Sequence, residues 1–283
     1  MPPPRSDTVW LVEAALAEDA PSGDLTAELV VAEGATCRAE LRAKAGGVLA
    51  GVAVAQAVFD LVAEQDGRGP IEVRWNHGDG DTVEPGDVVA AMAGPARSIL
   101  RAERVAINFL AHLSGVATLT RAFAEAARPA RILCTRKTTP GLRDLERDAV
   151  LAGGGSLHRS SLSDAVLIKD NHLRLAGGVT PAVTMAKADV VHVEVEVESL
   201  AELEEALMAG ADRILLDNPT PDLVRAAVDR VGDPDRLEIS GGVTLDSVPL
   251  LVAAGARVIS VGRITHSAPS LDLSLEVTDV DQV

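Results

Sequence analysis

Three short clusters of basic and small residues in the middle of the chain are the residues best suited to chemistry. They span residues 135–141, 153–159 and 167–172. Their cationic members are Arg136, Lys137, His158, Arg159 and Lys169. Between Arg131 and Arg174, eight Lys/Arg stand against five Asp/Glu, a local net charge of +3 in a chain of formal net charge −16. Such a reversal of charge favours a pocket for a small anion over the broad basic face that nucleic acid requires.

Solvated surface ion pairs are the alternative explanation for these charges, because most charged side chains lie at the surface. The cations, however, alternate with glycines and apolar runs instead of lying along one polar helix face. We therefore interpret them as parts of a binding site.

Length and composition restrict the class of protein. The 283 residues suffice for one large barrel-type domain or two modest ones, and 47% hydrophobic with 24% charged residues is ordinary for a folded cytosolic protein. Two cysteines, Cys37 and Cys134, make neither a disulfide framework nor a metal cluster. A signal-peptide pattern and an apolar run of the ~20 residues that span a bilayer are both missing. Two Trp, three Phe and no Tyr give few platforms for stacking bases. We expect a soluble, cytoplasmic protein without nucleic-acid or membrane partners.

The first part of the chain mixes helix and strand patterns. Apolar residues at helical spacing behind a polar start predict a helix over residues 8–18. Short apolar runs predict strands over 37–43, 71–75 and 88–93. An apolar period near 3.6 predicts a long helix over 99–113, which joins the two halves of the chain.

After residue 130, strand and helix patterns alternate. Predicted strands cover 131–135, 166–169, 190–197, 213–216, 237–239 and 258–261, and predicted helices include 199–209 and 221–231. Repeated βα units of this kind form a parallel sheet with right-handed connections. Six strands in a segment shorter than the ~250 residues of an eight-stranded barrel predict a smaller or incomplete α/β barrel.

Polar residues recur at the carboxyl ends of these strands, the edge where βα barrels build their active sites. They are Arg136, Lys137, Lys169, Glu196, Asp217, Ser240, Gly241, Gly242 and Gly262. In the third strand the valines share one face, and His192, Glu194 and Glu196 share the other, which points into the barrel. Glu194, the deeper of the two glutamates, could instead pair with a buried cation.

The chemistry of this rim suits a phosphorylated ligand. Glu196 and Asp217 on adjacent strands are oxygen ligands of the kind that Mg²⁺ prefers. Backbone N–H groups of residues 240–242 and 260–263 are suited to cradle a phosphate. The cations exceed what one phosphate needs, and arginine forks suit carboxylates. The predicted ligands are a phosphorylated sugar with Mg²⁺ and a polycarboxylate.

These motifs, in this order, resemble the quinolinate phosphoribosyltransferase family, the carboxylating nicotinate-nucleotide pyrophosphorylases among the type II phosphoribosyltransferases. The resemblance covers nearly the whole chain. Besides the three cationic clusters, it rests on residues 18–19, 23–26, 103–108, 113–118, 194–196, 216–218, 240–242, 260–262 and 266–267.

The resemblance implies an α/β protein with two domains. The first, residues 1–110, would be an α/β sandwich onto which the tail 270–283 packs, and the second, 111–269, an open α/β barrel. It also implies a homodimer in which the sandwich domain of one subunit covers the barrel of the other, so that Arg104 enters the partner's site.

The resemblance also implies the reaction and the residues that serve it. The family transfers phosphoribosyl from phosphoribosyl pyrophosphate (PRPP) to quinolinate with decarboxylation, giving nicotinate mononucleotide, CO₂ and pyrophosphate in NAD biosynthesis. Quinolinate would contact Arg104, Arg136, Lys137, His158, Arg159 and Lys169. PRPP would contact Lys169, Glu196, Asp217, Ser240, Gly241, Gly242, Ser260 and Gly262. Lys137, Glu196 and Asp217 would be catalytic, the last two also holding Mg²⁺.

Two positions depart from the family pattern, and three alternatives stay open. Cys134 stands where the family usually has aspartate, and Leu157 where it usually has asparagine. One alternative is a nicotinate phosphoribosyltransferase without decarboxylation, which needs fewer cations. Another is a same-fold paralogue that acts on a different metabolite, and the third is a non-catalytic binding protein.

Overall fold

Three separate stretches of chain build the first of two units in a computed structural model that describes residues 6–281. This first unit comprises the described residues through Leu119, Asp144–Gly153 and those from Ala268 onward, and the second comprises Thr120–Arg143 and Gly154–Ser267. We had expected a boundary near residue 110 and a return of the tail from residue 270.

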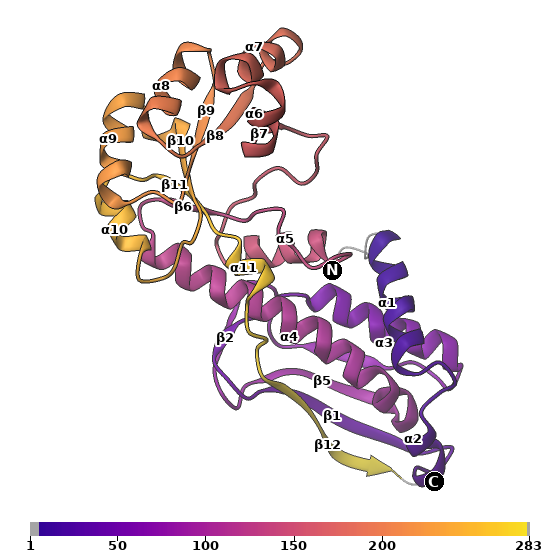
Figure 1. The fold of residues 1–283 in the computed structure, drawn as a ribbon. Helices are drawn as coiled ribbons and strands as arrows, with labels where there is room; N and C mark the ends of the chain where they lie inside the picture. Colours follow the sequence, from indigo (N-terminus) through magenta and orange to yellow (C-terminus); the bar gives the residue numbers. More distant parts are fainter. Residues whose placement is uncertain (1–5, 282–283) are drawn as a thin grey trace. The chain divides into compact units, whose positions relative to one another are not determined.

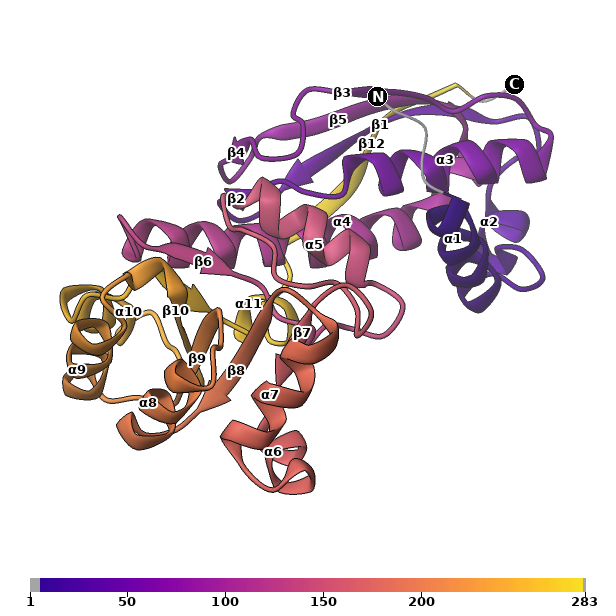
Figure 2. The ribbon, with the colours of Figure 1, turned by 90° about the horizontal axis from the view of Figure 1, so that it is seen from above.

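The first unit is an antiparallel sheet with helices on one face (Figure 1). The sheet has the strand order β12-β1-β5-β3. In Figures 1 and 2, α3 and α4 lie on the same side of it. The elements are α1 (Ser6–Asp19), α2 (Leu25–Val30), β1 (Thr36–Ala43), β2 (Gly47–Val48), α3 (Val52–Asp66), β3 (Glu72–Trp75), β4 (Thr82–Val83), β5 (Val88–Pro95), α4 (Ala96–Ala126), α5 (Arg143–Ala152) and β12 (Leu273–Asp281).

Strand β1 shows why this sheet has one covered and one open face. Its burial alternates, so that Cys37, Ala39 and Leu41 face the helices while Arg38 and Glu40 face outward. β1 pairs antiparallel with β5 on one side and with β12, the last strand of the chain, on the other. The first and the last strand of the chain therefore lie side by side, seen in Figure 1 as violet and yellow.

Helix α4 extends well beyond the predicted residues 99–113. Small and polar residues that we expected to end it, such as Ser114 and Gly115, instead lie inside the helix and allow close packing against it. Ser114 donates a hydrogen bond to the carbonyl oxygen of Ala50 at 3.3 Å, and Thr118 accepts one from the N–H of Val48 at 2.8 Å. A Cβ at Gly115 would stand 2.1 Å from the carbonyl oxygen of Pro269. The small side chains thus let two loops approach the helix.

The second unit is a six-stranded parallel sheet alternating with helices. Its elements are β6 (Arg131–Leu133), β7 (Val166–Ile168), α6 (Asp170–Ala176), α7 (Val179–Asp189), β8 (Val193–Val197), α8 (Leu200–Met208), β9 (Arg213–Asp217), α9 (Pro221–Val231), the 3₁₀ turn η1 (Pro234–Arg236), β10 (Leu237–Ser240), α10 (Val248–Ala253), β11 (Val258–Ser260) and α11 (Arg263–His266). The predicted six strands and α/β class are confirmed.

The strand order shows that this unit is a barrel opened at one seam. The order is β6-β11-β10-β9-β8-β7, and every neighbouring pair is parallel. Strands β7 to β11 are neighbours in chain order, and β11 pairs with β6. A closed barrel would need only the pairing of β6 with β7, which is missing among the described residues. On the side away from β11, β6 has a parallel bridge between Leu133 and Ser156 instead.

One predicted strand begins too early. The apolar run led us to expect a strand over 190–197, but α7 extends to Asp189 and β8 starts at Val193. The N–H of Val190 closes the helix on the carbonyl oxygen of Ala186 at 3.1 Å. His192 therefore lies in the exposed connection before the strand instead of inside the barrel.

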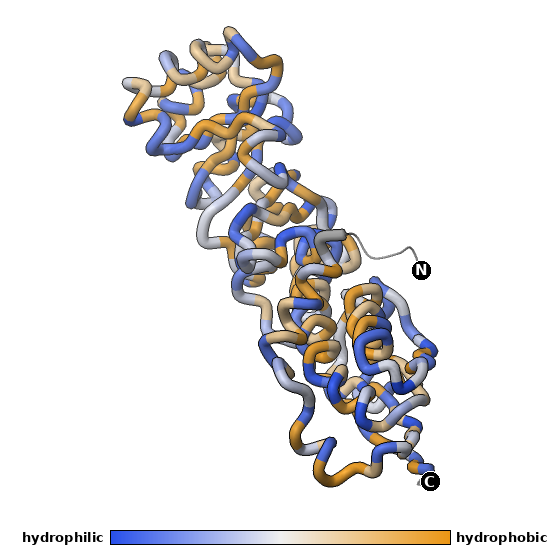
Figure 3. The backbone as a smooth tube through the Cα atoms, turned by 90° about the vertical axis from the view of Figure 1, so that its right-hand side faces the viewer, coloured by the Kyte–Doolittle hydropathy of each residue, from blue (hydrophilic) through white to orange (hydrophobic). Residues whose placement is uncertain are grey.

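Aliphatic side chains and a few phenylalanines form the core of each unit. The largest fully buried ones include Phe59 and Leu110 in the first unit and Ile214, Leu216 and Leu237 in the second. Figure 3 shows hydrophobic and hydrophilic residues alternating along the helices, as one buried side per helix requires. Within residues 6–281, no helix is long and apolar enough to cross a membrane.

The close approach at Gly115 yields a test of the first unit. We expect Gly115→Ala to lower the free energy of unfolding by about 1–3 kcal/mol, because the added methyl group must displace the Pro269 backbone. Gly78→Ala is the control, since a Cβ there meets Asp81 at an ordinary 3.8 Å. Urea denaturation of both variants measures the difference, and equal stabilities would contradict this packing.

Candidate active site

The carboxyl ends of the parallel strands bring the predicted polar residues to one edge of the second unit. Arg136 and Lys137 follow β6, and Lys169 follows β7. Asp217 and Ser240 end β9 and β10, and the two residues are paired in register. Because the strands are parallel, these side chains meet although they are far apart in the chain.

A polar cavity of about 260 Å³ lies at this edge. Its basic lining consists of Arg136, Lys137, His158, Arg159 and Lys169. Thr135, Ser240 and Ser260 add hydroxyl groups, and Glu238 adds a carboxylate. Five of the six cationic candidates from the sequence thus surround one space. Their roles in binding stay predictions.

The two arginines of the cavity are close enough to affect each other. Burial lowers the pKa of the Arg159 guanidinium, and the neighbouring positive charge of Arg136 lowers it further. The Nε atom of Arg136 is buried and has no hydrogen-bond partner among residues 6–281. Like charges held together with an unused donor are suited to an anion that enters the cavity.

A third arginine, which the sequence reasoning missed, joins the loops that carry these cations. Arg143 donates from Nε to the hydroxyl oxygen of Thr138 at 3.1 Å and from Nη1 to the carbonyl oxygen of Ser160 at 3.0 Å. Thr138 follows Lys137, and Ser160 follows Arg159. The guanidinium therefore fixes the spacing of two cationic loops. Only tertiary structure reveals this, since Arg143 belongs to no motif.

The lysines are anchored differently. Lys169 forms an ion pair with Glu196 from the neighbouring strand. The carbonyl oxygen of Lys137 accepts a hydrogen bond from the hydroxyl of Thr265 at 2.7 Å, and a Cβ at Gly262 would stand 3.2 Å from the Lys137 side chain. Gly262 thus leaves room for the Lys137 side chain. The charge of Glu196 is balanced by Lys169.

Asp217 is held by its neighbours in a tight turn. Asn218, the one non-glycine residue with positive φ (49°) in the described chain, donates from Nδ2 to the Asp217 carboxylate at 2.7 Å. Its N–H donates to the carbonyl oxygen of Ser240 at 2.8 Å. A Cβ at Gly241 would stand 2.6 Å from Asp217 Oδ1, so only glycine fits there. The sequence placed Asn218 in a motif but gave it no role.

The floor beneath the cavity is a buried ionic cluster. His158 Nε2 lies 3.4 Å from a carboxylate oxygen of Glu194 and 3.4 Å from one of Glu238. Arg213 lies 3.8 Å from Glu194 and 3.4 Å from Glu238. Glu194 thus lies beside two basic side chains, those of His158 and Arg213, which are 12% and 39% exposed, and pairing with a basic residue is the alternative that the sequence left open. Glu238 was missed, although it shares the inward face of its strand with Ser240.

Other predicted residues flank this cavity or lie elsewhere. Glu196, Asp217, Gly241, Gly242 and Gly262 do not line it, but they stand at the ends of β8 to β11 next to residues that do. Arg104 belongs to the first unit, where it lies on α4 with its side chain 61% exposed.

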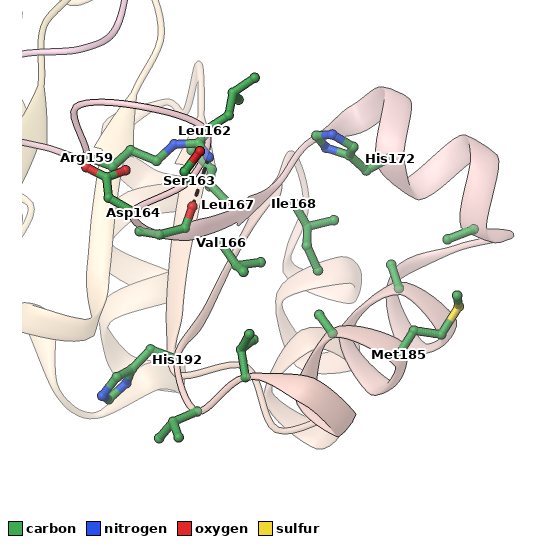
Figure 4. A pocket seen from close by; sticks show the side chains of 16 residues that line it. Arg159, Leu162, Ser163, Asp164, Val166, Leu167, Ile168, His172, Met185 and His192 are labelled. Carbon is green, nitrogen blue, oxygen red and sulfur yellow. Dashed lines mark hydrogen bonds between the residues drawn. The ribbon is translucent and has the colours of Figure 1, made fainter.

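A larger cavity of about 1060 Å³ runs along the edge strand β7. Figure 4 shows apolar side chains such as Val166, Ile168 and Met185 around it, with His172 and His192 far apart. It shares Arg159 with the polar cavity, but the other predicted cations do not line it. Size alone therefore does not identify the site, and the convergence of charge does.

Comparison with known proteins identifies relatives over nearly the whole chain. Residues 24–114 match the family model of the quinolinate phosphoribosyl transferase N-terminal domain, and residues 116–276 match that of the C-terminal domain. A probable nicotinate-nucleotide pyrophosphorylase [carboxylating] of Bacillus subtilis (strain 168) is 42% identical over 269 residues, covering 92% of this chain and 90% of the relative.

Two further relatives agree. Quinolinate phosphoribosyltransferase [decarboxylating] 1b of Nicotiana tabacum is 39% identical over 97% of this chain and 83% of its own length. The solved structure of the nicotinate-nucleotide pyrophosphorylase from Francisella tularensis superimposes with a TM-score of 0.90 at 38% identity, and the match covers 97% of each chain.

The charge of the polar cavity can be tested with inorganic pyrophosphate as a simple polyanion. We expect Arg136→Gln to weaken its binding about 10- to 100-fold, the usual effect of losing one or two charge-assisted hydrogen bonds. Arg225→Gln, at an exposed arginine paired with Asp222, is the matched control. Calorimetry at two salt concentrations measures both variants, and equal affinities for them would place the anion elsewhere.

Proposed function

Since the chain belongs to the quinolinate phosphoribosyltransferase family, we propose that it transfers phosphoribosyl from PRPP to quinolinate with decarboxylation, and that the polar cavity is where it does so. The observation that carries this proposal is the convergence of Arg136, Lys137, Arg159 and Lys169 on one space. A ring with two adjacent carboxylates needs this surplus of positive charge. Nicotinate, with one carboxylate, does not.

The arginines are suited to orient the ring acid. Each guanidinium can present two parallel N–H donors to a carboxylate, which fixes direction as well as charge. Arg136 has an unused buried donor, and Arg159 is held at both its backbone and its side chain. Orientation of this kind turns an encounter of two substrates into a positioned reaction.

The second substrate fits the ends of β8 to β11. The turn after β9 fixes the Asp217 carboxylate in place. Gly241 and Gly242 have left-handed backbone conformations (φ 86° and 57°), and they carry no side chains that would cover their backbone N–H groups. Such a turn lets backbone N–H groups approach a phosphate closely. Ser240 and Ser260 add hydroxyl donors.

The carboxylates of Glu196 and Asp217 fit a hard divalent cation, because they offer oxygen ligands at the ends of neighbouring strands. Mg²⁺ bound there would screen the charge of the departing pyrophosphate. The protein itself holds Asp217 through Asn218 and balances Glu196 with Lys169.

The charges also account for the chemistry. The pyridine nitrogen of quinolinate forms a bond to C1 of PRPP as the bond from C1 to the pyrophosphate oxygen breaks. Glu196 and Asp217 stabilise the positive charge that develops on the ribose ring. The resulting pyridinium nitrogen stabilises the electron pair left at C2 when the adjacent carboxylate departs as CO₂. A proton then takes that position, with Lys137 and Lys169 as the candidate donors.

A homodimer would complete this site. Arg104 is exposed in its own subunit and has Glu103 at 4.0 Å as its ionic partner. An exposed arginine in the first third of a long helix can reach the cavity of a second subunit, as the sequence resemblance implies. Cytoplasmic location likewise stays a prediction from the sequence.

One assay tests the activity and its nearest rival. The protein is mixed with Mg²⁺, PRPP and quinolinate labelled in the C2 carboxylate, and labelled CO₂ and nicotinate mononucleotide are expected in equal amounts. Nicotinate as sole acceptor is expected to turn over at least 100-fold less, because one carboxylate leaves part of the cation cluster unpaired.

Arg159→Ala is the matched test of the cavity in the same assay. We expect it to lose at least about 100-fold in kcat/KM, since it removes a fixed guanidinium from the acceptor's side of the site. Arg225→Ala should retain wild-type turnover. Efficient use of nicotinate, or full activity of Arg159→Ala with quinolinate, would contradict the proposal.

A further inference from the structure

His158 has both ring nitrogens engaged within the protein. Nδ1 accepts a hydrogen bond from the backbone N–H of Arg159 at 2.8 Å. Nε2 faces the carboxylates of Glu194 and Glu238, each at 3.4 Å. The sequence resemblance implied that this residue surrounds the substrate carboxylates. With these contacts, neither nitrogen points an N–H group at a ligand in the cavity.

The carboxylates that face Nε2 form a rigid support. The side chain of Glu238 is 1% exposed and that of Glu194 is 11% exposed. They extend from β10 and β8, on either side of β9, which supplies Arg213 as a counter-charge to both. Three neighbouring strands of the sheet therefore fix the position of the imidazole ring.

Two influences on the charge of His158 oppose each other. The carboxylates, Glu194 first and Glu238 second, raise the pKa of the imidazole. The N–H of Arg159 acts in the other direction, because an imidazolium carries a hydrogen on Nδ1 and cannot accept a bond there. The bond to Nδ1 is 0.6 Å shorter than either carboxylate contact. A ring that keeps this bond carries its one hydrogen on Nε2.

Arg159 is the residue that benefits from this arrangement. Its backbone is tied to His158, its Nη1 donates to the carbonyl oxygen of Ala165 at 3.1 Å, and the next residue is held by Arg143. The guanidinium is thus fixed at the cavity wall although it lies on a loop between α5 and β7. A loop residue needs such fixing to orient a carboxylate well.

We propose that His158 is a positioning residue, which anchors the Arg159 backbone to the buried carboxylates of the sheet and makes no hydrogen bond to the substrate. The proposal rests on the proposed function, since it assigns the recognition of quinolinate to Arg159 and its neighbours. It deepens that function by separating the cations that touch the ring acid from the residue that places them.

Two variants separate the two contacts of His158, the hydrogen bond that Nδ1 accepts from the Arg159 N–H and the contact of Nε2 with the carboxylates. Asn at position 158 puts an oxygen near the place of Nδ1, so His158→Asn can still accept from the Arg159 N–H. Gln puts an amide nitrogen near the place of Nε2, so His158→Gln keeps the contact with the carboxylates but loses the acceptor. His192→Gln, at an exposed histidine of the same unit, is the control, and thermal melting verifies that each variant is folded.

We expect His158→Gln to raise the KM for quinolinate about ten-fold or more, the effect of losing one hydrogen bond that orients a charged group. The KM for PRPP should change far less. His158→Asn should stay within about three-fold of the wild-type KM for quinolinate, because its acceptor is kept. Equal and large increases for both variants would mean that the imidazole binds the substrate itself, and would overturn the proposal.

A spectroscopic measurement tests the anchor independently of activity. In protein labelled with ¹⁵N-histidine, the His158 signals are assigned among the six histidines by their loss in His158→Asn. At pH 7 we expect Nδ1 to resonate as an unprotonated nitrogen and Nε2 as a protonated one. Two protonated nitrogens would overturn the proposal even if the variants misfold. Inactivity of the wild-type protein with quinolinate would refute the proposed function and leave this measurement valid.

Discussion

The positively charged side chains of Arg136, Lys137, Arg159 and Lys169 lie close together at the polar cavity of the second unit. The structure of that unit has to offset the repulsion between them. Burial and the neighbouring positive charge of Arg136 lower the pKa of the Arg159 guanidinium. Such a cluster is unfavourable unless anions balance it. Glu196 balances Lys169, whereas Glu194 and Glu238 lie beneath His158. The remaining positive charge in the cavity is the charge that a dianionic ring and a pyrophosphate would neutralise.

Parallel strands make this arrangement possible because they deliver all their carboxyl ends to one edge. The cations come from loops after β6 and β7, the acidic groups from β8 and β9, and the turns for phosphate from β10 and β11. The seam between β6 and β7 separates the two cationic loops in the sheet, and Arg143 and the anchor of His158 tie the intervening loop. These side-chain bonds, together with the backbone bridge between Leu133 and Ser156, hold the loop where the pairing of β6 with β7 is missing.

Local pattern predicted the strands and their polar ends, since apolar runs bounded by polar residues identify both. It failed where chain-distant contacts decide. Val190 and Val191 resemble the start of β8, but Val190 closes α7. Ser114 and Gly115 resemble a helix end, but they admit neighbouring loops against α4. Glu238, Asn218 and Arg143 acquire their roles only through partners elsewhere in the chain. Of the two departures from the family pattern, Cys134 is fully buried, and Leu157 lines a separate cavity that Glu194 and Arg213 also line.

A crystal structure of the protein with quinolinate tests the central claim most directly. The account predicts the ring in the polar cavity, with its carboxylates within hydrogen-bond distance of Arg136 and Arg159 and the imidazole of His158 still bonded to the Arg159 N–H. Quinolinate bound in the large apolar cavity along β7, or held at the surface away from both arginines, would contradict it.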